Sequence, residues 1–287
     1  MLSIPLTIAS TPDSDDAFYY DALENGLVSL PGFSPHFVRH PMAVLNRFAM
    51  ESRYEVTAIS SVIYPQIADR YAILSVGTSV GRGYGPVLVS RKPYELSDLA
   101  GRRVGVPGIP TTGWFLLTSL CPTVSVVEMP FDEIGEAVAV GKIDAGVMIH
   151  EELLFYPELG LRRVIDLGAA WCRRNALPLP VGLNVIRRDL GKAAMREICA
   201  AISASLQNAR DNPEPAIERV SRFGRGTEGG CTTRFVQMFA NEDSQRMPAD
   251  VRNALRVLFA EVVEFGLANE VPPVDIVEPA VAAVAVG

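Results

Sequence analysis

The stretch over residues 141–156, GKIDAGVMIHEELLFY, constrains the fold more than any other part of the chain. Its apolar run over 145–149 has the length and composition of a strand that is buried on both faces. The run ends in His150, and two acids, Glu151 and Glu152, follow. Open α/β sheets hold ligands at the carboxyl ends of their strands, so this pattern predicts an imidazole at a binding site. A histidine that only satisfies a loop carbonyl fits the spacing equally well.

Composition narrows the class of protein. The chain has 287 residues, of which 48% are hydrophobic and 21% charged, as in well-packed globular proteins. This length suits two domains. The formal net charge of −7 argues against a general nucleic-acid binder and against a protein that binds anionic membranes. No P-loop and no GxGxxG motif supports nucleotide binding.

The cysteines and the first residues indicate the compartment. Cys121, Cys172, Cys199 and Cys231 lie far apart without a CxxC spacing, which argues against a zinc site built from thiolates. The segment MLSIPLTIAS has neither the basic segment nor the apolar core of a signal peptide. No apolar run reaches the ~18 residues of a membrane span. We therefore expect a cytoplasmic protein with reduced thiols and no membrane span.

Along the first two thirds of the chain, short apolar runs alternate with helical patterns, which is typical of α/β proteins. Strands are expected over 2–10, 33–38, 54–59, 87–90, 103–106, 124–127, 145–149 and 163–166. Beyond residue 190 the apolar spacing approaches the helical period of ~3.6. It predicts helices over 193–208, 215–223, 232–241 and 248–265.

Two predicted helix starts carry polar groups. In TPDSDD the helix cap is Asp13, Ser14 or Asp15, and these acids either only cap the helix or also face a ligand. In GIPTTGWFLL, Thr111 and Thr112 precede an apolar helix. Capping explains one threonine, whereas two hydroxyls beside free backbone N–H groups suit a carboxylate.

Three further residues are weaker candidates. Ser60 and Ser61 end the third expected strand and either donate to a ligand or cap the next helix. Arg82 lies in a glycine-rich loop, where an anion contact competes with plain exposure to solvent. The other two histidines, His36 and His40, lack acidic or thiol neighbours and are expected to be structural or solvated.

Several segments together resemble one family. YEVTAISSVIYPQIADRYAILSVGTSVGRGYGP, VGVPGIPTTGWFLL, AGVMIHEELLFY and LPLPVGLNVI occur in the order, and at about the spacing, of the 1,4-dihydroxy-6-naphthoate synthase family of the futalosine route to menaquinone. With TPDSDDAFYYDAL they touch most of residues 1–187. The threonine pair and the IHE tip are the most specific parts of the resemblance.

The resemblance implies an α/β fold like that of periplasmic solute-binding proteins. Such proteins have two lobes joined by two extended crossings, with a ligand cleft between the lobes. Composition places the crossings near residues 90–95 and 177–183. The expected lobes are residues 1–90 with 183–287, including the C-terminal helices, and residues 91–182.

The resemblance also implies a reaction. The family converts cyclic dehypoxanthinylfutalosine to 1,4-dihydroxy-6-naphthoate as a lyase without a metal or other cofactor. A proton leaves the substrate, and the sugar-derived fragment departs as the ring becomes aromatic. The expected partner is thus a small aromatic carboxylate.

Site residues follow from the matched positions. His150 corresponds to the family's proposed general base, a task that suits a neutral imidazole. Thr111 and Thr112 match the pair that holds a carboxylate, Ser60 matches a pocket position, and Asp16 matches the acid of the first loop. The expected substrate-binding set is completed by Ser61, Gly108 and Arg82.

The sequence also departs from the family pattern. The family's first loop reads close to SPCPNDTF, so that here Asp15 replaces an amide and Ala17 a hydroxyl. Ser61 and Val62 follow Ser60 where the family often has an aromatic residue. A solute-binding or sensor protein of the same fold and a paralogous enzyme with another aromatic or carboxylate ligand are therefore alternatives. The apolar tail over 271–287 packs either on a surface groove or on a partner chain, which would make a homodimer.

Overall fold

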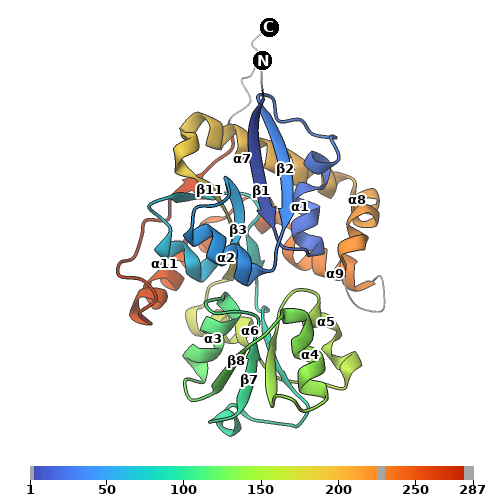
Figure 1. Cartoon of the computed structure of the whole chain (residues 1–287), viewed down its shortest axis with the longest axis vertical. Helices are drawn as coiled ribbons and strands as arrows, with labels where there is room; N and C mark the ends of the chain where they lie inside the picture. Colours follow the sequence, from blue (N-terminus) through green and yellow to red (C-terminus); the bar gives the residue numbers. More distant parts are fainter. Residues whose placement is uncertain (1–2, 225–229, 281–287) are drawn as a thin grey trace.

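The computed structural model describes residues 3–224 and 230–280 and arranges them in two α/β lobes, each built on its own sheet (Figure 1). In the larger sheet, β1 runs parallel to β2 and β3, whereas β11 runs antiparallel to its neighbours β3, β4 and β5. The spatial order is β12 (Ile276–Val277), β4 (Tyr71–Leu74), β11 (Leu179–Arg187), β3 (Val56–Ser60), β1 (Ile4–Ser10) and β2 (Phe33–Arg39), with β5 (Ser79–Gly81) paired to β11.

The smaller sheet is organised around β9, the strand that the apolar run before His150 predicts. Every residue of β9 is buried, since strands flank it on both sides and helices cover it. β7 lies parallel to β9 and β6 antiparallel to it. The order is β10 (Arg162–Asp166), β6 (Val87–Ser90), β9 (Ala145–Met148), β7 (Arg103–Val106) and β8 (Ser125–Glu128).

The chain passes between the lobes earlier than the sequence analysis expects. β6 pairs with β9 and β10, so Val87–Ser90 lies in the smaller sheet and the first crossing falls within residues 82–86. The return crossing ends at β11, whose first residue, Leu179, already pairs with β5. We therefore place the lobe boundaries before residue 87 and before residue 179, instead of after residues 90 and 182. A four-residue apolar strand carries no local signal for the sheet that it joins.

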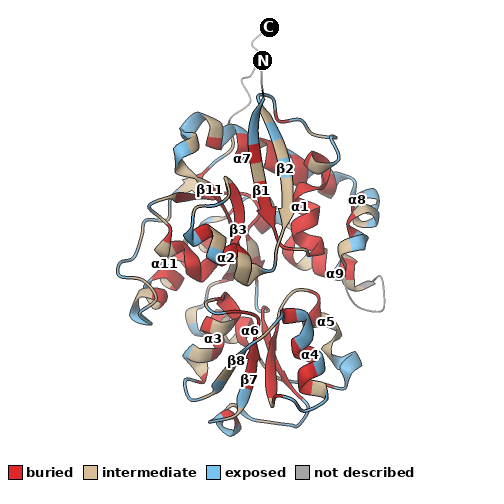
Figure 2. Ribbon diagram, viewed as in Figure 1, coloured by how far each residue is buried: buried red, intermediate tan, exposed pale blue. Residues whose placement is uncertain are grey.

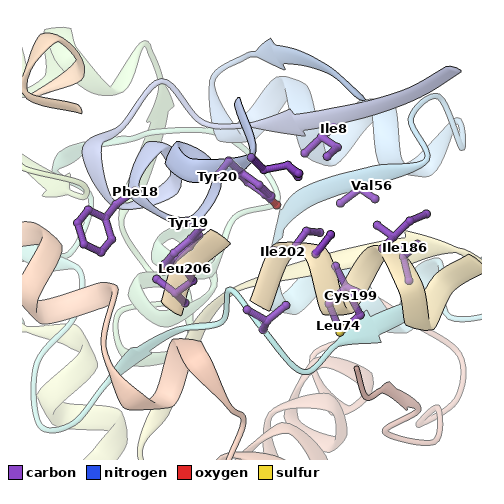
Figure 3. Close-up of a cluster of buried hydrophobic side chains, with 14 of the residues drawn as sticks. Ile8, Phe18, Tyr19, Tyr20, Val56, Leu74, Ile186, Cys199, Ile202 and Leu206 are labelled. Carbon is purple, nitrogen blue, oxygen red and sulfur yellow. The ribbon is translucent and has the colours of Figure 1, made fainter. Parts of the chain in front are cut away.

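Helix α1 forms the centre of the larger lobe. It spans Ser14–Glu24 and is buried from Ser14 to Leu23 (Figure 2). The sheet and the helices α7 (Lys192–Asp211), α8 (Pro213–Val220) and α9 (Gly230–Phe239) surround it. Figure 3 shows Tyr20 of α1 and Ile202 of α7 in one cluster with Val56 of β3. The other helices on this lobe are α2 (Met42–Met50), α7 (Lys192–Asp211) and α8 (Pro213–Val220).

The smaller lobe has its own helices, and the C-terminal helices of the larger lobe also pack against it. Phe235 and Phe239 of α9 pack in a cluster with Ile134 of the smaller lobe, and Leu258 of α11 packs in another with Trp171. The smaller lobe carries α3 (Thr112–Leu120), α4 (Phe131–Ala139), α5 (Glu152–Phe155) and α6 (Leu167–Asn175). The C-terminal helices are α9 (Gly230–Phe239), α10 (Glu242–Gln245) and α11 (Ala249–Glu264). Short 3-10 helices are η1 (Ser61–Gln66), η2 (Leu96–Leu99), η3 (Tyr156–Leu159), η4 (Arg188–Leu190) and η5 (Ser221–Phe223).

Part of the apolar tail packs on the chain's own larger lobe. Ile276 and Val277 form β12 beside β4, and both side chains contact the buried clusters of that lobe. The last stretch of the tail, residues 281–287, lies outside the described residues. Cys121, Cys172 and Cys199 are free thiols.

Candidate active site in the interlobe cleft

A cleft of about 640 Å³, counted with its open mouth, lies where the two lobes meet. The segments that follow β1, β7 and β9 and the last residue of β3 all reach it, which is the usual position of ligands on open α/β sheets. Five predicted site residues line this cleft: Asp16, Ser60, Thr111, Thr112 and His150. Large apolar side chains, among them Met42, Phe235 and Phe239, supply walls that suit a flat aromatic ring.

His150 lines the cleft and has one ring nitrogen without a hydrogen-bond partner among the described residues. Its backbone adopts a left-handed conformation with a φ of 54°, which histidine tolerates better than most residues. Nδ1 lies 2.7 Å from Oδ2 of Asp13. The ring of Phe131 meets the imidazole edge to face, with centroids 5.0 Å apart. Nε2 is buried and has no hydrogen-bond partner among the described residues, so it is the nitrogen left for a ligand.

The start of α1 and the tip of β9 are joined by two side-chain contacts across the lobes. Asp13 occupies the N-cap position of α1, yet its side chain makes no capping hydrogen bond and pairs with His150 instead. The backbone N–H and the hydroxyl of Ser14 both donate to Oε1 of Glu151. Asp13, Ser14 and Glu151 are fully buried. A purely capping role, one of the two alternatives for this loop, therefore does not describe Asp13.

Two further acids of α1 line the cleft, and burial raises the pKa of each. Burial raises the pKa of Asp15 to about 8, with the charge of Asp16 adding to this effect and that of His150 opposing it. Asp15 is thus largely protonated at neutral pH, so the carboxyl group adds little negative charge there. Burial also raises the pKa of Asp16, but the hydroxyl and N–H of Thr11, which donate to Asp16 over 2.6 and 2.7 Å, oppose the shift.

The threonine pair provides a helix start at the cleft. The hydroxyl of Thr111 accepts from the N–H of Trp114 over 3.2 Å and donates to the carbonyl of Gly108 over 2.9 Å. The hydroxyl of Thr112 donates to the carbonyl of Val181 over 2.7 Å. Neither hydroxyl hydrogen therefore remains for a ligand. What the pair offers an anion is the first backbone N–H groups of α3 and the positive end of its dipole.

Ser60 keeps a hydroxyl hydrogen for the cleft, whereas the next residue, Ser61, does not line it. The side-chain amide of Asn46 in α2 donates to Oγ of Ser60 over 3.0 Å and accepts from the Ser60 N–H over 2.9 Å. The same amide donates to the carbonyl of Pro110, which ties α2 to the loop before α3. Ser61, the first residue of the 3-10 helix η1, is fully buried and does not line the cleft.

Arg82 and Gly108 have structural positions instead of ligand contacts. The guanidinium of Arg82 binds Asp243 over two 2.7 Å hydrogen bonds and also reaches Asp250 over 2.8 Å, so its donors are engaged away from the cleft. Gly108, with a φ of 141°, comes so close to α2 that a Cβ would lie 2.4 Å from that of Ala43. Ser61, Arg82 and Gly108 thus lie outside the lining of this cleft.

Sequence reasoning missed several residues that complete the site. Asp13 stood only as a candidate cap, and its pairing with His150 crosses two lobes, so no local pattern reveals it. Asn46 lies inside a short apolar helix and gives no signal. Phe235 and Phe239 follow the spacing of an ordinary core helix. Glu152, a buried neighbour whose pKa burial raises to about 7, does not line the cleft.

The described residues include no group of three or more histidines, cysteines and acids suited to a metal ion. Among the helices of residues 3–224 and 230–280, none combines the length and the apolar character that crossing a bilayer requires.

Comparisons with known proteins place the chain among proteins of menaquinone biosynthesis. Residues 6–264 match a family model described as "Menaquinone biosynthesis". A protein of Thermus thermophilus named "1,4-dihydroxy-6-naphtoate synthase" is 37% identical over 268 residues, which cover 93% of this chain and 97% of that protein. A protein of the same name from Streptomyces coelicolor is 32% identical over 275 residues, covering 93% and 96%.

Solved structures resemble the whole chain. A crystal structure of an Archaeoglobus fulgidus protein has a TM-score of 0.88 at 40% identity and covers 92% of this chain and 98% of its own. The periplasmic aliphatic sulphonate binding protein of Escherichia coli has a TM-score of 0.68 at 13% identity, with coverage of 97% and 94%. The second likeness concerns the fold alone, and it confirms the expected two-lobed fold of periplasmic binding proteins.

Proposed function

Since the chain belongs to the family of menaquinone biosynthesis proteins, we propose that it is a 1,4-dihydroxy-6-naphthoate synthase like its two named relatives. The family model and the two relatives confirm the family that the sequence motifs indicate. One observation supports the proposal most: the unpartnered Nε2 of His150 belongs to the same cleft as the N-terminus of α3. A base and an anion-binding group in one apolar cleft suit an enzyme that takes a proton from an aromatic carboxylic acid precursor.

The proposed substrate is cyclic dehypoxanthinylfutalosine. Its carboxylate lies at the start of α3, where backbone N–H groups and the helix dipole stabilise the negative charge. The ring packs on the apolar wall that includes Phe235 and Phe239. The hydroxyl of Ser60 and the protonated carboxyl group of Asp15 donate to the substrate's oxygen atoms.

The proposed chemistry begins at His150. Its Nε2 takes a proton from a substrate carbon, and the electron pair of that C–H bond moves into the ring system. The bond to the sugar-derived fragment breaks, the fragment leaves with its electron pair, and the ring becomes aromatic. The enzyme is thus proposed to be a lyase that needs neither a metal nor a redox cofactor.

The test is to incubate the purified protein with cyclic dehypoxanthinylfutalosine and to follow both compounds by chromatography and mass spectrometry. The proposal predicts catalytic turnover to 1,4-dihydroxy-6-naphthoate. Recovery of tightly bound, unchanged substrate after hours would favour the solute-binding or sensor alternative. Turnover of a related aromatic acid, but not of this compound, would indicate the paralogous enzyme.

Three expectations from the sequence stay predictions. They are a location in the cytoplasm, the absence of a nucleic-acid partner, and a homodimer formed through the apolar tail. Light scattering behind a sizing column tests the dimer, since removal of residues 281–287 should then lower the measured mass to that of a monomer.

A further inference from the structure

The proposed base receives its partner from the opposite lobe. His150 follows β9 of the smaller lobe, whereas Asp13 precedes α1 of the larger lobe. Nδ1 and Oδ2 of the two residues are 2.7 Å apart, and the side chains are 12% and 0% exposed. Such a pair lies largely out of water, where the electrostatic interaction between a carboxyl group and a neighbouring imidazole is strong.

The surroundings fix the imidazole in this orientation. Phe131 covers one side of the ring, and the Ser14–Glu151 contact joins the adjacent residues of the two chain segments. Other acids also face this region: Asp15 and Asp16 of α1, and Glu151 and Glu152 at the start of α5. Asp13 is the acid that contacts Nδ1.

We propose that Asp13 is a positioning residue that holds the proton of neutral His150 on Nδ1 and so keeps Nε2 available as the base. This inference rests on the proposed function, in which His150 takes the substrate proton. A neutral imidazole carries one proton, and an acceptor at Nδ1 keeps that proton there. After Nε2 has taken the substrate proton, the Asp13 side chain stabilises the imidazolium, as in other carboxylate–histidine pairs.

The position of the pair adds a consequence for the catalytic cycle. Because Asp13 and His150 belong to different lobes, opening of the cleft would separate them. The base is therefore assembled only when the lobes are closed over the cleft. Closure would thus both exclude water and set the tautomer that the reaction requires.

Two substitutions and a matched control test the role of Asp13. Asp13→Asn keeps the shape and removes the charge, whereas Asp13→Leu removes the acceptor altogether. Both should lower kcat by about 10²-fold, since a mispositioned base loses most of its effect, while KM stays within about threefold. The control is Asp21→Asn, because Asp21 is a buried acid of the same helix that pairs with Arg219 instead. It should leave kcat unchanged.

A second readout needs neither substrate nor turnover. Nitrogen NMR of the protein labelled with 15N-histidine reports which ring nitrogen carries the proton. The His150 signals are identified by their loss in His150→Gln, leaving those of His36 and His40. Wild type and Asp21→Asn should show His150 protonated on Nδ1, and Asp13→Leu should lose this state.

The outcomes separate this inference from the proposed function. A wild-type protein with neutral His150 protonated on Nε2 overturns the inference even if no Asp13 variant folds. So does an Asp13→Leu variant with an unchanged kcat. A third outcome is also possible: the Nδ1 proton is present in the wild type and absent in Asp13→Leu, but the wild type does not turn over the substrate. This result would support the pairing of Asp13 with His150 and contradict the proposed function.

Discussion

At the scale of single residues, the carboxyl group of Asp15 makes the stability of the fold depend on pH. The native state holds its proton with a pKa of about 8, whereas the unfolded chain has an ordinary value of 3.8. Folding therefore takes up a proton between these two pH values. The stability that the neutral group contributes is fully present below about pH 4 and is lost as pH rises through about 8.

This linkage predicts the behaviour of Asp15→Asn. The amide cannot ionise, so the variant escapes the loss, whose slope approaches about 1.4 kcal/mol per pH unit. The melting temperature of the variant should exceed that of the wild type increasingly from pH 4 to pH 8. Thermal unfolding at several pH values measures the difference, with the exposed Asp69→Asn as a control. Parallel curves for wild type and Asp15→Asn would contradict the buried, protonated state.

Thr111 illustrates how a predicted site residue acts through backbone geometry. In Thr111→Val the cap of α3 is lost and the carbonyl of Gly108 loses its donor. We expect the free energy of unfolding to fall by about 1–2 kcal/mol in denaturant titrations. Thr111→Ser retains both hydrogen bonds and should stay within about 0.5 kcal/mol of the wild type. Equal losses in the two variants would assign the effect to the methyl group instead.

At the scale of elements, the loop before α3 determines how closely the lobes approach at α2. In Gly108→Ala, the new Cβ would lie 2.4 Å from that of Ala43. The clash and the φ of 141° should together lower the free energy of unfolding by about 1–3 kcal/mol, and KM should rise as the cleft is distorted.

The matched control for this loop is Gly101→Ala. Gly101 also has a positive φ, of 70°, but no atom lies within 4 Å of its added Cβ. It should therefore cost only the backbone term of about 1–2 kcal/mol and leave KM unchanged. An unchanged KM in Gly108→Ala would show that this contact does not shape the cleft.

Arg82 lies in the crossing before β6, and a substitution there tests whether its role is structural. The structure binds its guanidinium to Asp243 and Asp250, so Arg82→Gln should lower the melting temperature while KM changes less than about twofold. Steady-state kinetics beside a thermal melt separate the two effects. A large rise in KM with an unchanged melting temperature would restore Arg82 as a ligand contact, as the glycine-rich loop first suggested.

At the scale of the whole molecule, sequence reasoning succeeded where the signal is local. The spacing over 248–265 predicts a helix, and α11 spans Ala249–Glu264, because helical periodicity is contained in the segment itself. The family motifs indicated the two-lobed fold. They also selected His150, Thr111 and Thr112, which line one cleft in the structure. The sheet that Val87–Ser90 joins was not predictable, because pairing with β9 and β10 depends on residues far along the chain.

The contacts between the lobes at the site could not be predicted from the sequence for the same reason. Ser14 and Glu151 are separated by 137 residues, and no pattern in either segment points to the other. The sequence also did not reveal that both threonine hydroxyls are used inside the protein, because their acceptors lie in the loop before α3 and in β11. Residue types thus located the cleft, whereas the three-dimensional arrangement decided which atoms remain for a ligand.

The most direct test of the account concerns His150 in the closed molecule. His150→Gln keeps a polar side chain of similar size but cannot take a proton, so single-turnover conversion of cyclic dehypoxanthinylfutalosine should slow by about 10²–10⁴-fold with little change in binding. A wild-type rate in this variant would remove His150 from the chemistry and contradict the account.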